Sequence, residues 1–238
     1  MSKIGKIACF VMLISIAFGC CSQVWAEESI CFGKTKHGRL AGGVSLPYSG
    51  DNFSAYSTVG WLAGRTYVHS KVAQVVLASY ASLKKTIPDA VFVYGETGWE
   101  SGGSFKPHKT HQNGLSVDLM VPVRDAEGRS VPLPCSVFNK LGYALEFDSA
   151  GRMGSLQIDF EALAEQIYWL HKKASAYDIR IWRVIFDSEL QKNLKKTKRW
   201  TYLSKHIAFS TRRSWVRHDE HIHVDFIVPC KPLSHFER

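Results

Sequence analysis

The sequence has little of what marks a membrane span, a repeat protein or a cysteine-bound metal module. Its main apolar run, Ile7 to Gly19, is thirteen residues long, whereas crossing a bilayer takes about twenty. No internal repeat and no low-complexity linker divides the chain. Six cysteines are present, and none has the short pairwise spacing of a zinc finger. These absences favour one globular domain without a thiolate metal site.

The first 26 residues have the pattern of an export signal. Two lysines precede the apolar run, and "VWA" then places small residues where a signal peptidase requires them. We therefore expect residues 1–26 to be a signal peptide, cleaved after Ala26, and residues 27–238 to form the mature domain. A second interpretation takes "AFGC" as a lipidation site at Cys20, which would attach the chain to a membrane. Both interpretations predict export.

Export determines how the remaining cysteines are interpreted. Cys31, Cys135 and Cys230 follow the leader, and disulfides persist in oxidising compartments outside the cytosol. Three cysteines predict one bridge and one free or buried thiol. A bridge between Cys31 and Cys230 would tie the two ends of the domain together, although the spacing alone leaves the pairing open.

The net charge is strongly positive. It is +9 for the whole chain, and subtracting the two lysines of the leader leaves +7 for the mature domain. Much of the excess lies in residues 192–200 and 211–217. A solvated basic face explains such runs, and attraction to an anionic surface or polymer is the alternative. The chain is predicted to be exported and has no recognisable nucleic-acid module. We therefore expect the anionic partner to be a cell wall or a membrane, and not a nucleic acid.

Hydrophobic periodicity predicts an α+β domain. Apolar residues recur at helical spacing in Tyr67 to Thr86 and again in Ile158 to Asp178. Before the first of these helices, residues 27–60 are rich in glycine and serine and predict an extended, loop-rich segment. Strands are expected at Ala90–Thr97, Gly114–Val123, Ile179–Phe186 and His221–Pro229. The prediction is a single domain with a central, mainly antiparallel sheet flanked by helices.

Five of the ten histidines fall into two clusters. One cluster lies in "HKTHQNGLSVDLMVP", just before a predicted strand. In that strand, Asp118 interrupts a mostly apolar run. In the other, "RHDEHIHVDF", the two histidines of H-x-H point to the same face of a strand. Zinc accepts imidazole nitrogen and carboxylate oxygen, and a site with three protein ligands keeps one position open for water. We therefore predict a catalytic zinc site where the two segments meet. The alternative is that each histidine makes only a local hydrogen bond. The members of the two clusters are His108, His111, His218, His221 and His223.

These motifs resemble a known family. "GGSFKPHKTHQNGLSVDLMVP", followed distantly by "HDEHIHVDF", is similar to the penicillin-insensitive murein endopeptidases. They belong to a wider group of zinc peptidases with H-x6-D and H-x-H motifs, which includes lysostaphin-type peptidases, D-Ala-D-Ala peptidases and hedgehog domains. "HGRLAGGVSLP" near the mature N-terminus extends the resemblance over most of the domain. The family has more cysteines than this mature chain, so the resemblance does not imply how the loops of this chain are braced.

The resemblance implies a role for each clustered residue. His111, Asp118 and His223 would hold one zinc ion per chain. His221 would act as the catalytic acid and base beside a metal-activated water, with His218 orienting it. His108 would line the substrate pocket.

The implied function is hydrolysis of peptidoglycan cross-links between D-alanine and diaminopimelate in the periplasm. No motif indicates a serine nucleophile, the group that penicillin acylates. Two alternatives remain at this point. A murein D,D- or L,D-carboxypeptidase would use the same ligands, and a zinc-stabilised wall-binding module would need the ligands without a positioned base.

Overall fold

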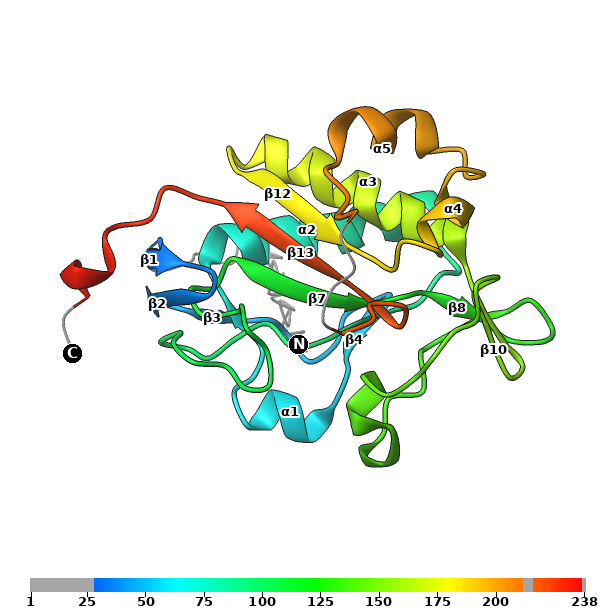
Figure 1. Cartoon of the computed structure of the whole chain (residues 1–238), viewed down its shortest axis with the longest axis horizontal. Coiled ribbons are helices and arrows are strands. Elements are labelled where there is room, and N and C mark those ends of the chain that lie inside the picture. Colours follow the sequence, from blue (N-terminus) through cyan, green and yellow to red (C-terminus); the bar gives the residue numbers. More distant parts are fainter. Residues whose placement is uncertain (1–27, 212–215, 237–238) are drawn as a thin grey trace, which may run out of the picture.

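Two long helices cover one face of a five-stranded sheet, and the main hydrophobic core fills the layer between them (Figure 1). This computed structural model describes residues 28–211 and 216–236. The predicted signal peptide and its cleavage point lie outside these residues. In the described part of the chain, no helix combines the length and apolar character needed to cross a membrane.

The central sheet has the strand order β12-β13-β7-β6-β4. Its neighbours are antiparallel except for β4 and β6, which are parallel. This confirms the predicted α+β fold with a mainly antiparallel sheet. The strands are β4 (Phe53–Ala55), β6 (Phe92–Tyr94), β7 (Ser116–Met120), β12 (Arg180–Ile185) and β13 (His221–Ile227).

The covering helices are amphipathic and lie close to their predicted positions. Helix α2 (Ser70–Thr86) and helix α3 (Phe160–Ala176) pack against each other and bury one stripe each, as helical periodicity requires. Asp159 caps α3 by accepting a hydrogen bond from the Ala162 N–H at 3.0 Å. The short helices α4 (Gln191–Leu194) and α5 (Trp200–His206) pack on the outer side of α3.

Two predicted boundaries differ from the structure for identifiable reasons. The predicted helix from Tyr67 begins only at Ser70, because Tyr67 and Val68 form β5 (Tyr67–Val68), which pairs with β3 (Val44–Ser45). The strand predicted to reach Val123 ends at Met120. Proline cannot donate to a strand ladder, and after Pro122 the chain enters a separate four-stranded sheet. The strands of that sheet are β8 (Val123–Arg124), β9 (Ser130–Val131), β10 (Arg152–Met153) and β11 (Leu156–Ile158).

The N-terminal segment contains more structure than its composition predicts. It begins with a hairpin of β1 (Ile30–Lys34) and β2 (His37–Ala41), and α1 (Thr58–Leu62) follows β4. Later in the chain, the 3₁₀ elements η1 (Val137–Gly142) and η2 (Leu233–His235) complete the described elements.

A disulfide joins the first strand to the C-terminal segment. Cys31 and Cys230 are bonded across 199 residues of sequence, and Cys135 is a half-buried free thiol. One bridge and one free thiol are what the sequence predicts, and the structure gives the pairing that the sequence left open. The bridge holds the hairpin beside the chain that leaves β13, where Lys231 N also donates to Cys31 O at 2.9 Å.

Because this bridge closes a loop of nearly the whole domain, its loss should destabilise the fold. For the double variant Cys31→Ser, Cys230→Ser we expect the free energy of unfolding to fall by about 2–5 kcal/mol, measured by urea denaturation. Cys135→Ser is the control and should change this free energy much less. An unchanged unfolding midpoint in the double variant would contradict a stabilising role for the bridge.

Candidate metal centre

Asp118 lies at the middle of the site, on β7, the central strand of the five-stranded sheet. Its side chain is 0% exposed and stands in register opposite His223 on β13. Alternation along β7 sends Val117 and Leu119 into the core beneath the helices and Asp118 to the opposite face. Burying a carboxylate is costly unless it is paired, and four imidazole rings surround this one.

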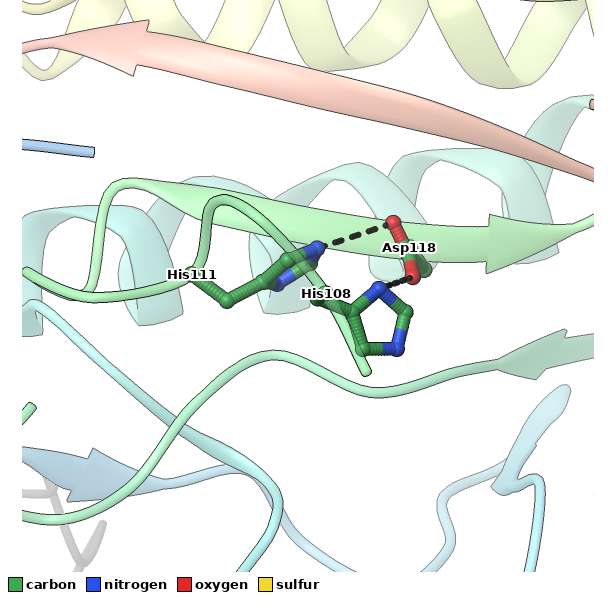
Figure 2. Close-up of side chains that lie close together, drawn as sticks. All are labelled: His108, His111 and Asp118. Atoms are coloured by element: carbon green, nitrogen blue, oxygen red, sulfur yellow. Dashed lines mark ion pairs between the residues drawn. The ribbon is translucent and has the colours of Figure 1, made fainter. Parts of the chain in front are cut away.

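His111 approaches Asp118 from the loop that precedes β7 (Figure 2). Its Nε2 is 3.2 Å from Asp118 Oδ1, and its Nδ1 is 3.1 Å from Thr97 O. A carbonyl oxygen only accepts hydrogen bonds, so Nδ1 carries the proton and Nε2 presents a lone pair to the carboxylate. This buried Nε2 has no hydrogen-bond partner within the described residues. A cation between the two groups would satisfy both.

The backbone of His111 supports a functional reason for this placement. Its φ is 66°, in the left-handed region. A non-glycine residue adopts this conformation at a cost, and such residues concentrate at functional sites. The loop therefore holds the His111 ring against Asp118 at the expense of local backbone energy.

Strand β13 contributes two histidines to the same face, as the H-x-H spacing predicts. His223 Nδ1 is 2.8 Å from Asp118 Oδ1, and His223 Nε2 is 2.9 Å from Asp225 Oδ1. His221 Nε2 lies 3.8 Å from the same Asp118 oxygen. The two segments singled out in the sequence therefore meet, and three imidazoles face one oxygen atom.

The other carboxylate oxygen has different neighbours. Tyr143 donates its hydroxyl hydrogen to Asp118 Oδ2 at 3.0 Å, and His108 Nδ1 lies 3.6 Å from Oδ2 (Figure 2). His108, His111 and Asp118 form a group whose ligand atoms all lie within 4.8 Å of one another, and this group could hold a metal ion. His108 is thus part of the cluster, but it reaches Asp118 on the oxygen opposite His111.

A buried glutamate holds His108 in place. Glu96 Oε2 is 2.6 Å from His108 Nε2, and Glu96 also accepts hydrogen bonds from Arg65 and from the Tyr56 hydroxyl. Burial alone would raise the pKa of Glu96, but His108 and Arg65 outweigh it and lower the pKa to about 2. Because Glu96 stays ionised, it fixes the His108 ring with Nδ1 directed at the site.

Electrostatics make the centre a place that requires positive charge. Burial would raise the pKa of Asp118, but His111 and His221 lower it well below its ordinary value. Burial keeps the pKa of His111 low, so its imidazole stays neutral. Burial also opposes a charge on His223, yet Asp225 and Asp118 raise its pKa to about 10. The neutral His111 beside the ionised Asp118 is the charge state in which a metal ion binds, whereas His223 would bind a metal ion only after giving up its Nδ1 proton.

The site opens on a cavity of about 740 Å³. The histidines that line this cavity are His108, His218, His221 and His223, whereas His111 and Asp118 lie below its surface. His108 was predicted to line the substrate pocket, and it does line this cavity. All six predicted site residues are therefore brought together in the cavity or directly beneath it.

The contact that orients His221 comes from a residue that the sequence analysis did not select. His221 Nδ1 is 2.9 Å from Glu220 Oε1. His218 instead places its Nδ1 2.9 Å from Val216 O and packs its ring against that of His221, with centroids 4.7 Å apart. Burial raises the pKa of Glu220 to about 8, so positive charge on His221 would favour its ionised form.

Four residues of the site were not predicted from the sequence, and the sequence patterns that could have indicated them differ. Asp225 follows His223 by two positions and could have been found by strand alternation, and Glu220 directly precedes His221. Glu96 comes just after the short strand β6. Tyr143 has no local signal, since it reaches Asp118 from a separate loop.

A buried carboxylate among imidazoles beneath an open cavity is the donor set of a metal-dependent hydrolase. Residues 31–234 match the penicillin-insensitive murein endopeptidases. The chain belongs to this metallopeptidase family, so its substrate class is peptidoglycan. Among curated proteins the chain has no match. Family membership together with the disulfide indicates a location outside the cytoplasm.

The residues present fit a zinc ion. Zinc accepts imidazole nitrogen and carboxylate oxygen, and the buried, unpartnered His111 Nε2 offers such a nitrogen beside Asp118 Oδ1. Zinc-binding histidines also usually donate their second N–H to a carboxylate or a carbonyl. His223 and His111 meet this condition through Asp225 and Thr97.

Zinc binding should stabilise the protein only while Asp118 is present. With free zinc at 1,000 times its Kd, binding adds about 4 kcal/mol, or roughly 8–16 °C in Tm for a chain of this size. We expect this rise in differential scanning calorimetry for the wild type and for Asp51→Ala, a control at an exposed carboxylate. Asp118→Ala should show no rise, and an equal rise in all three proteins would exclude Asp118 from the site.

Proposed function

We propose that the protein is a periplasmic zinc endopeptidase that cuts peptidoglycan cross-links between D-alanine and diaminopimelate. The observation that carries this proposal is the convergence of His111 Nε2 and His223 Nδ1 on one oxygen of Asp118, at 3.2 and 2.8 Å. Export through a signal peptide of residues 1–26, with residues 27–238 as the catalytic domain, is part of the same proposal.

The proposed zinc ligands are His111, Asp118 and His223. They are preferred to a set containing His108 because both imidazoles face Asp118 Oδ1, whereas His108 lies at Oδ2. When bound, one zinc ion would supply Lewis-acid activation of water and of the scissile carbonyl. Tyr143 occupies Oδ2 through its hydroxyl, which leaves Oδ1 turned toward the two imidazoles.

His221 is the proposed general base and acid. In this role His221 carries its hydrogen on Nδ1, which lies 2.9 Å from Glu220 Oε1, and the Nε2 lone pair is then on the side of the ring that faces the site. Nε2 takes a proton from the attacking water as the oxygen bonds to the carbonyl carbon. It then delivers that proton to the amide nitrogen as the C–N bond breaks, which releases a carboxylic acid and an amine.

His218 and His108 act at the wall of the cavity. His218 packs on the His221 ring and limits its rotation, while Glu220 sets which nitrogen of His221 carries the proton. His108 is fixed by Glu96 with its other nitrogen 3.6 Å from Asp118 Oδ2. Both histidines line the cavity that the substrate would enter.

Replacing His221 should separate catalysis from metal binding. His221→Ala should keep one zinc per chain and lose about 10²- to 10⁴-fold in kcat, since it removes the proton transfer alone. The control, His37→Ala, changes an exposed histidine outside the cavity and should leave kcat unchanged. Metal content is measured by mass spectrometry, and activity by digestion of isolated sacculi.

The products of that digestion test which bond is cut. Loss of cross-linked muropeptide dimers, with new monomers in their place, is the result expected for the wild type. Shortening of monomer stem peptides with the dimers intact would identify a carboxypeptidase instead. Full dimer cleavage by His221→Ala would overturn the proposed role of His221.

A further inference from the structure

The rim of the cavity is basic. Among the lining residues that the structure describes, four carry cationic side chains and Glu96 is the only carboxylate residue. Glu96 is already paired with Arg65 and His108. The cavity therefore favours a substrate that brings negative charge with it. The cationic residues are Lys36, Lys109, Lys140 and Arg183.

Among these residues, Arg183 is committed elsewhere. Its Nε donates to Asp225 at 2.7 Å, and its guanidinium lies 4.4 Å from the ring centroid of Trp182. Lys140 makes no ion pair with any of the residues that the structure describes. Its side chain is exposed at the cavity, so its ammonium group can bind an incoming anion.

The backbone that carries Lys140 is held in an unfavourable conformation. Lys140 and Leu141 have φ values of 51° and 60°, and two successive non-glycine residues in the left-handed region are costly. Asn139 holds this turn, because its Oδ1 accepts from Ser136 N at 2.8 Å and Gly142 N at 2.7 Å. The turn leads directly to Tyr143, which contacts Asp118. Lys140 thus lies in a turn that is held by the Asn139 side chain and that is joined through Tyr143 to Asp118.

The proposed substrate has an anion beside the bond that is cut. In a cross-link through diaminopimelate, the carbon that bears the scissile nitrogen also bears a free carboxylate. We propose that Lys140 binds this carboxylate and makes the enzyme selective for cross-links in which it is free. This inference rests on the proposed function, since it names how the same site recognises its substrate.

The test uses two cross-linked dimers that differ only at this group, one with the free carboxylate and one with its carboxamide. The wild type is compared with Lys140→Met, with Lys140→Arg, which keeps the charge, and with Lys36→Met, which removes a charge elsewhere on the same rim. For each protein, kcat/KM is measured on both dimers. The Kd of each dimer is also measured with metal removed by a chelator.

We expect the wild type to prefer the free carboxylate by about tenfold or more, the size of a charge-assisted hydrogen bond. For Lys140→Met, kcat/KM on the carboxylate dimer should fall until the preference is lost. Its kcat/KM on the amidated dimer should equal that of the wild type. Lys140→Arg and Lys36→Met should keep the preference.

Three results would overturn the proposal: equal slowing of both dimers by Lys140→Met, loss of the preference in Lys36→Met as well, or no preference in the wild type. If the wild type cleaves neither dimer, the proposed function fails. The ratio of the two Kd values then still decides whether Lys140 recognises the carboxylate.

Discussion

The buried carboxylate of Asp118 is the constraint on which the site depends. It is fully buried on the central strand of the sheet, and its charge must be balanced from the face opposite the core. The chain meets this requirement with imidazoles from a strained loop and from β13. Sheet register places the β13 pair correctly, because His223 stands directly opposite Asp118. The alternation of side chains along β7 thus places apolar residues in the core and Asp118 in the candidate metal centre.

Oxygen atoms behind the imidazoles fix the orientation of each ring. Each ring has one nitrogen held by an oxygen and the other directed toward Asp118. The holding atoms belong to a carbonyl and to three carboxylates, which come from different parts of the fold. An imidazole fixed in this way offers a lone pair in a defined direction once the nitrogen that faces Asp118 is deprotonated, as metal binding and proton transfer both require. The acceptors are Thr97, Glu96, Glu220 and Asp225.

The sequence could predict the parts of this arrangement that follow local rules. Helical periodicity located α2 and α3, and the H-x6-D and H-x-H spacings located the central cluster. Tertiary effects account for what it could not predict. Val68 joined a strand instead of a helix because it pairs with Val44, and Pro122 divided a continuous apolar run between two sheets. Tyr143 reaches Asp118 from a loop, and no spacing in the sequence relates the two.

In the proposed site, a metal ion is held between His111 Nε2, His223 Nδ1 and Asp118 Oδ1. Anomalous diffraction from crystals of the purified protein, recorded above and below the zinc edge, tests it most directly. We expect one zinc peak at about 2.0–2.2 Å from each of these three atoms. A peak bonded to His108 and to Asp118 Oδ2, with His223 left on Asp225 alone, would contradict it.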